Sequence, residues 1–160
     1  MKSWKIILCI TSYLCILGSL ATGAQNLPLN LKKSGVALEG FDPTSYHTGI
    51  PVKGSAKITL NYEGAIYYFS TQENLTIFQE KPEKFVPAFG GWCAWAMLDG
   101  QKVKVDPKRF KIVNGKTYLF YNTFFTDTLK KWNTLATKET ESSLVKRANE
   151  HWQKILSQQI

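Results

Sequence analysis

The chain is poor in the residues that most often mark a catalytic or a disulfide-stabilised protein. It contains three cysteines and two histidines among 160 residues, and Cys9 and Cys15 both lie near its start. Only Cys93 follows residue 24, so that part of the chain cannot form an internal disulfide. G-x-S-x-G, H-E-x-x-H and phosphate-loop motifs are also absent. Cys93 and His47 are the only candidates for a catalytic thiolate–imidazole pair. The segment that contains Cys93 is apolar, which favours an unreactive thiol. We therefore lean against an enzyme, and a redox enzyme is the least favoured function.

Long apolar runs are equally scarce, because the only one spans residues 6–20, after Lys2 and Lys5. A small-residue stretch follows it at residues 21–24. This three-part arrangement is typical of a secretory signal peptide. The apolar run is shorter than the ~20 residues of a membrane span, although an uncleaved anchor is the alternative. We expect residues 1–24 to be removed after Gly23 or Ala24, and the protein to be periplasmic or secreted.

Acidic residues are in the minority, with 12 Asp and Glu against 20 Lys and Arg. Loss of Lys2 and Lys5 would leave 18 basic and 12 acidic residues, a net charge of +6. The basic residues are spread along the chain with acidic ones between them, whereas nucleic-acid binding favours a one-sided stripe. We expect no nucleic-acid partner and, at most, weak electrostatic contact with a membrane.

The remaining chain predicts one α+β domain over residues 35–156, after a polar, flexible leader at residues 25–34. Alternating residues at 57–61 and 66–69 indicate a hairpin around Gly64, and Asn114-Gly115 indicates a second. A capping box at residues 70–73 begins a helix that ends before Pro82. Two helices finish the chain, and the last has an apolar stripe at Leu144, Val145, Ala148, Trp152 and Ile155 that should pack on the rest of the domain. We expect a small antiparallel sheet built from the two hairpins, with helices packed on it.

The two expected hairpins share residues at a fixed spacing. Three of them recur 51 positions later in the chain, Gly64, Tyr67 and Phe69 as Gly115, Tyr118 and Phe120. Each hairpin is preceded by an Asp-Pro dipeptide, at residues 42–43 and 106–107, that is typical of a helix start, and each is followed by a helix. Duplication of a strand–strand–helix unit explains this pattern, and independent use of common hairpin residues is the alternative.

Residues 62–85 contain Y-x-G-x-x-Y-x-F-S, then N-x3-F and P-x-K-F. With GFDPTSY at residues 40–46 and FGGWCAWA at residues 89–96, these motifs resemble the YHS domain, and in particular its longer, exported members. The resemblance runs from about Gly35 to Trp152. The resemblance implies the fold and export from the cytoplasm, but it indicates no particular reaction.

Short YHS domains resemble metal binders whose motifs begin D-P-V-C-G-M and continue F-C-S-x-x-C. Ser45, Ser70 and Asn74 stand here where those cysteines would be, so the implied site is damaged or moved. Cys93 and Met97 would share one face of a helix, and thiolate with thioether suits Cu(I). His47 is a candidate third ligand. Copper is therefore the first cofactor to consider, although buried Cys and Met are also common core residues.

An aromatic-lined pocket is the second interpretation, because Tyr and Trp combine apolar walls with polar tips. Its candidate ligand-binding residues are Tyr46, Tyr67, Trp92, Trp95, Tyr118 and Tyr121. These six are also suited to an ordinary core. The sequence thus predicts an exported, non-catalytic binding domain for a soft metal ion or, alternatively, for a small organic molecule or a protein partner.

Overall fold

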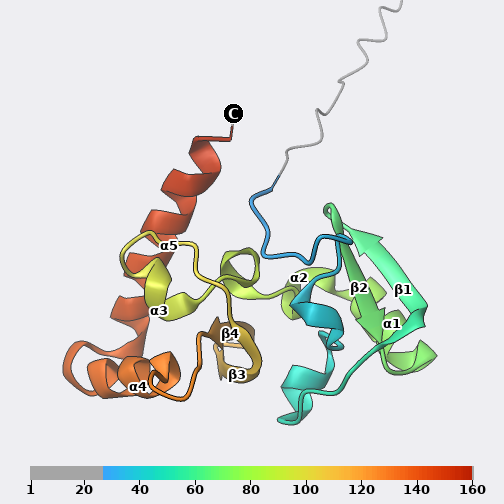
Figure 1. The fold of residues 1–160 in the computed structure, drawn as a ribbon, viewed down its shortest axis with the longest axis horizontal. Coiled ribbons are helices and arrows are strands. Elements are labelled where there is room, and N and C mark those ends of the chain that lie inside the picture. Colours follow the sequence, from blue (N-terminus) through green and yellow to red (C-terminus); the bar gives the residue numbers. More distant parts are fainter. Residues whose placement is uncertain (1–26, 160) are drawn as a thin grey trace, which may run out of the picture.

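A computed structural model describes residues 27–159 of the chain (Figure 1). The expected signal peptide lies outside these residues. The described elements are, in chain order, the 3₁₀ helices η1 (Leu38–Gly40) and η2 (Ser45–Thr48), strands β1 (Ser55–Tyr62) and β2 (Ala65–Phe69), helices α1 (Gln72–Glu80) and α2 (Pro82–Phe85), η3 (Ala88–Gly91), α3 (Ala94–Met97), strands β3 (Asp106–Val113) and β4 (Lys116–Phe120), and helices α4 (Thr128–Glu139) and α5 (Glu141–Ser157). No helix within residues 27–159 has both the length and the apolar character needed to cross a bilayer.

The α+β class and both hairpins are confirmed, and each hairpin is a separate two-stranded antiparallel sheet. β1 and β2 turn at Glu63 and Gly64 (φ 49° and 81°), and β3 and β4 turn at Asn114 and Gly115 (φ 50° and 73°). Two consecutive positive φ values are what a two-residue turn needs to follow the twist of its strands. The strands do not join into one sheet. The β1–β2 hairpin lies at one end of the molecule, α4 and α5 at the other, and β3–β4 between them (Figure 1).

The 51-residue repeat extends through the backbone of both halves of the chain, the first from η1 to α1 and the second from η3 to α4. β1 and β2 shifted by 51 positions have the bounds of β3 and β4, and the strand registers and their irregularities shift by the same amount. Residues 38–40 have φ of 53°, 52° and 84°, and residues 89–91 have φ of 54°, 58° and 85°. The Asp42 N–H donates to Val52 O at 2.9 Å, and the Cys93 N–H to Val103 O at 3.0 Å. This correspondence supports a duplicated unit over independent hairpins.

Two of the expected helix starts differ from the structure. Thr71, rather than Ser70, caps α1, because its Oγ1 accepts the Asn74 N–H at 3.1 Å. The backbone N–H and hydroxyl of Ser70 are directed to another residue, Asp42. Residues 106–107 begin strand β3 and no helix. The repeat equivalent of residues 42–43 is instead residues 93–94, at the start of α3.

Two clusters of buried apolar side chains form the core, each drawn mainly from one half of the chain. The first surrounds Phe69 and Phe78, and the second surrounds Phe120 and Trp132, all four fully buried. The expected apolar stripe of the last helix packs on the second cluster, where Leu144 and Ala148 are also fully buried. Burial of each large aromatic ring contributes roughly 1.5–3 kcal/mol to folding.

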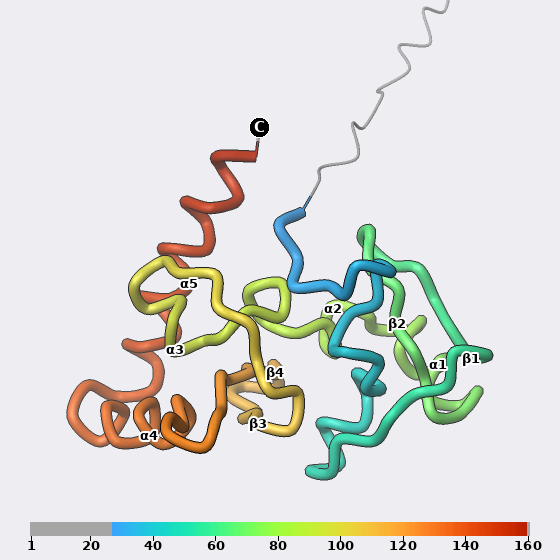
Figure 2. Tube along the Cα trace, viewed as in Figure 1, coloured from blue at the N-terminus to red at the C-terminus, as the bar shows by residue number. Residues whose placement is uncertain are grey.

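Residues 27–34 differ from the expected flexible leader, because they pack between the two halves (Figure 2). The Asn30 backbone N–H donates to Gly90 O, and its side-chain amide donates to Gly91 O, both at 2.9 Å. Leu29 and Leu31 pack against the first core cluster. The overall polar composition of this segment suggests flexibility, but Leu29 and Leu31 alternate with its polar residues and supply the apolar contact.

Candidate functional site

A partly open cavity of about 460 Å³ lies where the two halves of the chain meet. Tyr67 and Tyr118, which are equivalent in the repeat, both line it. Phe89 and Trp152 add further aromatic surface, with ring centroids 6.4 Å apart. The other lining residues are Leu27, Leu29, Glu63, Val86, Pro87, Ala88, Gly90, Lys116, Asn149 and Leu156. The volume and the mostly apolar walls are typical of small-molecule sites.

The lining of this cavity carries one basic and one acidic side chain, Lys116 and Glu63. Lys116 Nζ donates to Glu83 O at 2.7 Å. Burial lowers the pKa of Lys116, while Glu63 and Glu83 act in the opposite direction. Burial raises the pKa of Tyr67 and that of Tyr118, so both phenols stay protonated in neutral solution and are available as hydrogen-bond donors.

The structure brings together only two of the six aromatic residues expected to line a pocket, Tyr67 and Tyr118. Tyr46 is buried against the Phe110 ring, and its hydroxyl has no hydrogen-bond partner within the described chain. Trp92 donates its indole N–H to Pro28 O. Trp95 lines a separate shallow depression beside α4.

Tyr121, the last of the six, directly follows β4 and contributes hydrogen bonds through its backbone N–H and carbonyl. Its N–H donates to Cys93 Sγ at 3.3 Å, and its carbonyl accepts the Thr128 hydroxyl at 2.7 Å. Phe89, Trp152 and Lys116 were not identified from the sequence as cavity residues. The helical stripe that contains Trp152 was visible, but nothing in the sequence relates it to η3 or β4.

The candidate soft-metal residues lie in different surroundings. Cys93 is fully buried as the N-cap of α3, in an extended conformation (φ −61°, ψ 120°), so it precedes the helix that contains Met97 and does not lie within it. Met97 is fully buried in the second core cluster. His47 packs against the Phe85 ring, with centroids 5.0 Å apart, and lies 3.4 Å from Thr117 Oγ1 through Nε2. The described residues contain no cluster of three or more His, Cys, Asp and Glu side chains able to hold a metal ion.

Hydrogen bonds occupy the Cys93 thiol. Thr128 Oγ1 lies 3.5 Å from Cys93 Sγ and already donates its proton to Tyr121 O. The S–H must therefore be the donor toward Thr128, while Sγ accepts the Tyr121 N–H. This arrangement suits a protonated thiol. A soft-metal ligand would be a thiolate.

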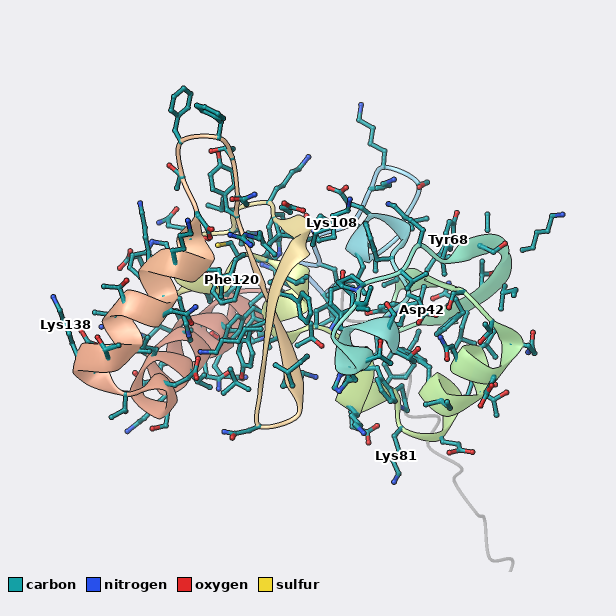
Figure 3. The ribbon with its side chains drawn as sticks, turned by 90° about the horizontal axis from the view of Figure 1, so that it is seen from below. Asp42, Tyr68, Lys81, Lys108, Phe120 and Lys138 are labelled. Atoms are coloured by element: carbon teal, nitrogen blue, oxygen red, sulfur yellow. The ribbon has the colours of Figure 1, made fainter. Side chains whose placement is uncertain are left out.

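Ser45, Ser70 and Asn74 do come together, around the buried side chain of Asp42 (labelled in Figure 3). The Ser70 N–H, the Ser70 hydroxyl and the Asn74 amide donate to Asp42 Oδ2 at 2.8, 2.7 and 2.8 Å. The Thr44 N–H and hydroxyl donate to Oδ1 at 2.9 and 2.7 Å. The Ser45 hydroxyl donates to Asp42 O at 2.7 Å. We call Asp42, Thr44, Ser45, Ser70 and Asn74 the Asp42 network.

Burial alone would raise the pKa of Asp42, but hydrogen bonds from Ser70, Asn74 and Thr44 outweigh it and hold the pKa below its usual value. The buried carboxylate is thus ionised and surrounded by donors. Hydroxyl and amide groups are poor ligands for a soft ion, and those of Ser70 and Asn74 are already committed to Asp42. The residues at the family's cysteine positions therefore do not fit the metal that the short YHS domains suggest.

The family comparison agrees with the motifs in the first half of the chain. Searches among curated proteins and solved structures find no match. The family model of the YHS domain matches residues 44–89, which extend from η2 through the first hairpin, α1 and α2 to η3. The matched segment includes Ser45, Ser70 and Asn74 of the Asp42 network and Tyr67 of the cavity, and residues 44–89 of this chain are therefore similar to the YHS domain.

Proposed function

We propose that the protein is a non-catalytic binding protein that holds a small, mostly apolar organic molecule with one anionic end. The cavity of about 460 Å³ between the two halves supports this, because its size lies within the 300–1,000 Å³ typical of ligand pockets. The rings of Tyr67, Tyr118, Phe89 and Trp152 would contact the apolar body, and Lys116 would attract the anionic end.

The two phenols give the proposed site its selectivity. Both hydroxyls are donors at neutral pH, so they favour ligands with acceptor groups. Glu63 on the same lining disfavours a second anionic group nearby. Aromatic carboxylates and sulfonates with two or three fused or linked rings combine these properties.

Two naphthalene dyes test this assignment, anionic anilinonaphthalene sulfonate and neutral phenylnaphthylamine. Asn149 is exposed on α5 and lines the cavity, so Asn149→Phe should block it without entering the core. We expect this substitution to remove the fluorescence gain of both dyes. Gln153 is also an exposed residue of α5 but does not line the cavity, so Gln153→Phe is the matched control. This variant should retain the fluorescence gain of both dyes.

Lys116→Met tests recognition of the anionic end of the ligand separately from recognition of its apolar body. It should weaken binding of the sulfonate about tenfold and leave binding of the neutral dye within about twofold, because one close ion pair contributes roughly 1–2 kcal/mol in a partly buried site. Unchanged binding of both dyes in Asn149→Phe would refute a ligand site in this cavity.

Export is also part of this proposal and rests on the sequence of residues 1–24. Expression in a host with a secretory pathway and intact-mass measurement of the released protein test it. We expect a chain that begins at Ala24 or Gln25. A mass that retains residues 1–20 would contradict the proposal.

A further inference from the structure

Two large aromatic side chains are almost completely exposed in the loop between β4 and α4. Phe124 is 95% and Phe125 92% exposed, and their ring centroids lie 5.1 Å apart. The loop projects away from the body of the protein beside α4 (Figure 3). Neither ring belongs to a core cluster, so the fold does not account for their presence.

The repeat shows that this loop is an addition to the second unit. The backbones correspond with an offset of 51 residues up to Ser70 and Tyr121, whose N–H groups are both donors to a buried side chain. The next equivalent positions are the helix caps Thr71 and Asp127, which are 56 residues apart. Five residues are thus inserted. Because the first unit makes the same hairpin-to-helix connection without them, the connection itself does not require the five extra residues.

The base of the loop is held in place. Asn122 pairs with Asp127, and the Thr123 N–H donates to Thr126 O at 2.8 Å. Arg109 pairs with Asp127, which also caps α4 by accepting the Lys130 N–H. The exposed rings are therefore presented on an anchored turn and do not hang from a free segment.

The surroundings of the loop are basic. Lys130 and Lys131 lie in the first turn of α4, five and six residues after Phe125, and are exposed. Together with Lys138 they line a shallow depression of about 360 Å³ with Trp95 and Leu135. At the loop base, Asp127 pairs with Arg109, while Asp106 keeps its charge and accepts the Asn122 amide at 3.2 Å. Within the described residues, Lys130, Lys131 and Lys138 form no ion pair. Unpaired positive charge therefore accompanies the aromatic tip.

We propose that this face docks the protein onto an anionic lipid surface, with Phe124 and Phe125 inserted at the interface and Lys130, Lys131 and Lys138 over the headgroups. Aromatic rings favour the headgroup region, and each nearby lysine strengthens binding to anionic lipid about fivefold. A stable protein–protein contact would need a surface of about 800 Å² on each partner. A narrow projecting tip with two rings suits insertion into lipid better than such a surface.

Co-sedimentation with vesicles tests this proposal on the chain from Gln25, which contains every residue of both core clusters and lacks the apolar run of residues 6–20. Vesicles of phosphatidylcholine with one-third phosphatidylglycerol should bind the protein, and vesicles of phosphatidylcholine alone should bind it at least about tenfold more weakly. Phe124→Ser with Phe125→Ser should reduce binding to the anionic vesicles at least about tenfold without changing the melting temperature. Ile50→Ser removes an apolar side chain that is 70% exposed elsewhere and should have no effect.

Two further results decide between the lipid and other occupants of this face. Lys130→Glu with Lys131→Glu should weaken anionic binding about 20-fold or more and reduce its dependence on salt. Phe125→Trp should show an emission that shifts to the blue with anionic vesicles and is quenched by brominated acyl chains. The proposal is overturned if the parent chain does not bind anionic vesicles or if the double Phe variant binds them as well as the parent. It is also overturned if size-exclusion chromatography shows that the two rings mediate self-association instead.

Discussion

The Asp42 carboxylate and the Cys93 thiol hold equivalent positions in the two halves of the chain, 51 residues apart. Asp42 Oδ2 accepts the Ser70 N–H at 2.8 Å, and Cys93 Sγ accepts the Tyr121 N–H at 3.3 Å. Each fully buried side chain thereby fastens the segment that precedes a hairpin to the residue that follows it. The same structural task is performed by a charged group in one unit and by a thiol in the other. This relationship explains Cys93 without a metal, and it makes Asp42 the more critical residue, because more donors depend on it.

Asp42→Asn should lower the free energy of unfolding by about 3 kcal/mol, because Ser70, Asn74 and Thr44 would lose a buried charged acceptor. Glu73→Gln, at an exposed carboxylate on α1, is the control and should change it by less than about 0.5 kcal/mol. Urea unfolding measured by tryptophan fluorescence gives both values.

Acid unfolding supplies a second readout for Asp42. Since the pKa of Asp42 is lowered in the folded protein, its contribution is present above the unfolded pKa of about 3.9 and is lost as the pH falls through the lower folded value. The variant should therefore differ from the parent much less at pH 2 than at pH 7. Equal stability of Asp42→Asn and the parent at pH 7 would contradict the role assigned to the network.

Local signals in the sequence predict the hairpins well, and residues far apart in the sequence determine the site. Asn114-Gly115 needs only its own backbone preferences to turn, and the structure has both residues at positive φ. Lys116, Phe89 and Trp152 meet at one cavity only after two units and α5 have packed. The sequence around Ser70 predicts a helix cap, because a cap needs only local partners, whereas the actual partner of Ser70, Asp42, is 28 positions away.

Gly115→Val should destabilise the protein by about 1–3 kcal/mol, because a β-branched residue would have to adopt φ near 73°. A Cβ at this position has no heavy atom within 4 Å, so the cost comes from the backbone and not from a clash. Gly115→Asn should cost less, because Asn tolerates the left-handed region. The two melting temperatures test this order, and a Val variant as stable as the parent would rule out the turn type.

His47 should make the protein less stable in mildly acidic solution. Burial, Lys84 and Lys116 lower its pKa, so the folded state favours the neutral ring. Its contribution is therefore complete above the unfolded pKa of about 6.5 and is lost as the pH falls toward the lower folded value. The melting temperature of the parent should fall between pH 7.5 and 5.5, and that of His47→Gln should fall less. An identical pH profile in His47→Gln and the parent would exclude His47 as the cause.

Cys93 offers the sharpest test between a structural residue and a soft-metal ligand. We expect the reduced parent protein to retain no Cu(I) against a competing chelator, because the thiol donates to Thr128 and accepts from Tyr121 in the core. Cys93→Ala should lower the free energy of unfolding by about 1–3 kcal/mol, since the Tyr121 N–H loses its acceptor. Cys93→Ser should cost less than Cys93→Ala, because a hydroxyl can still accept that N–H.

A soft-metal site predicts a different pattern, in which the parent binds one Cu(I), Cys93→Ala and Cys93→Ser abolish binding equally, and Met97→Leu weakens it. Retention of one Cu(I) by the parent and its loss in both Cys93 variants would overturn the structural assignment.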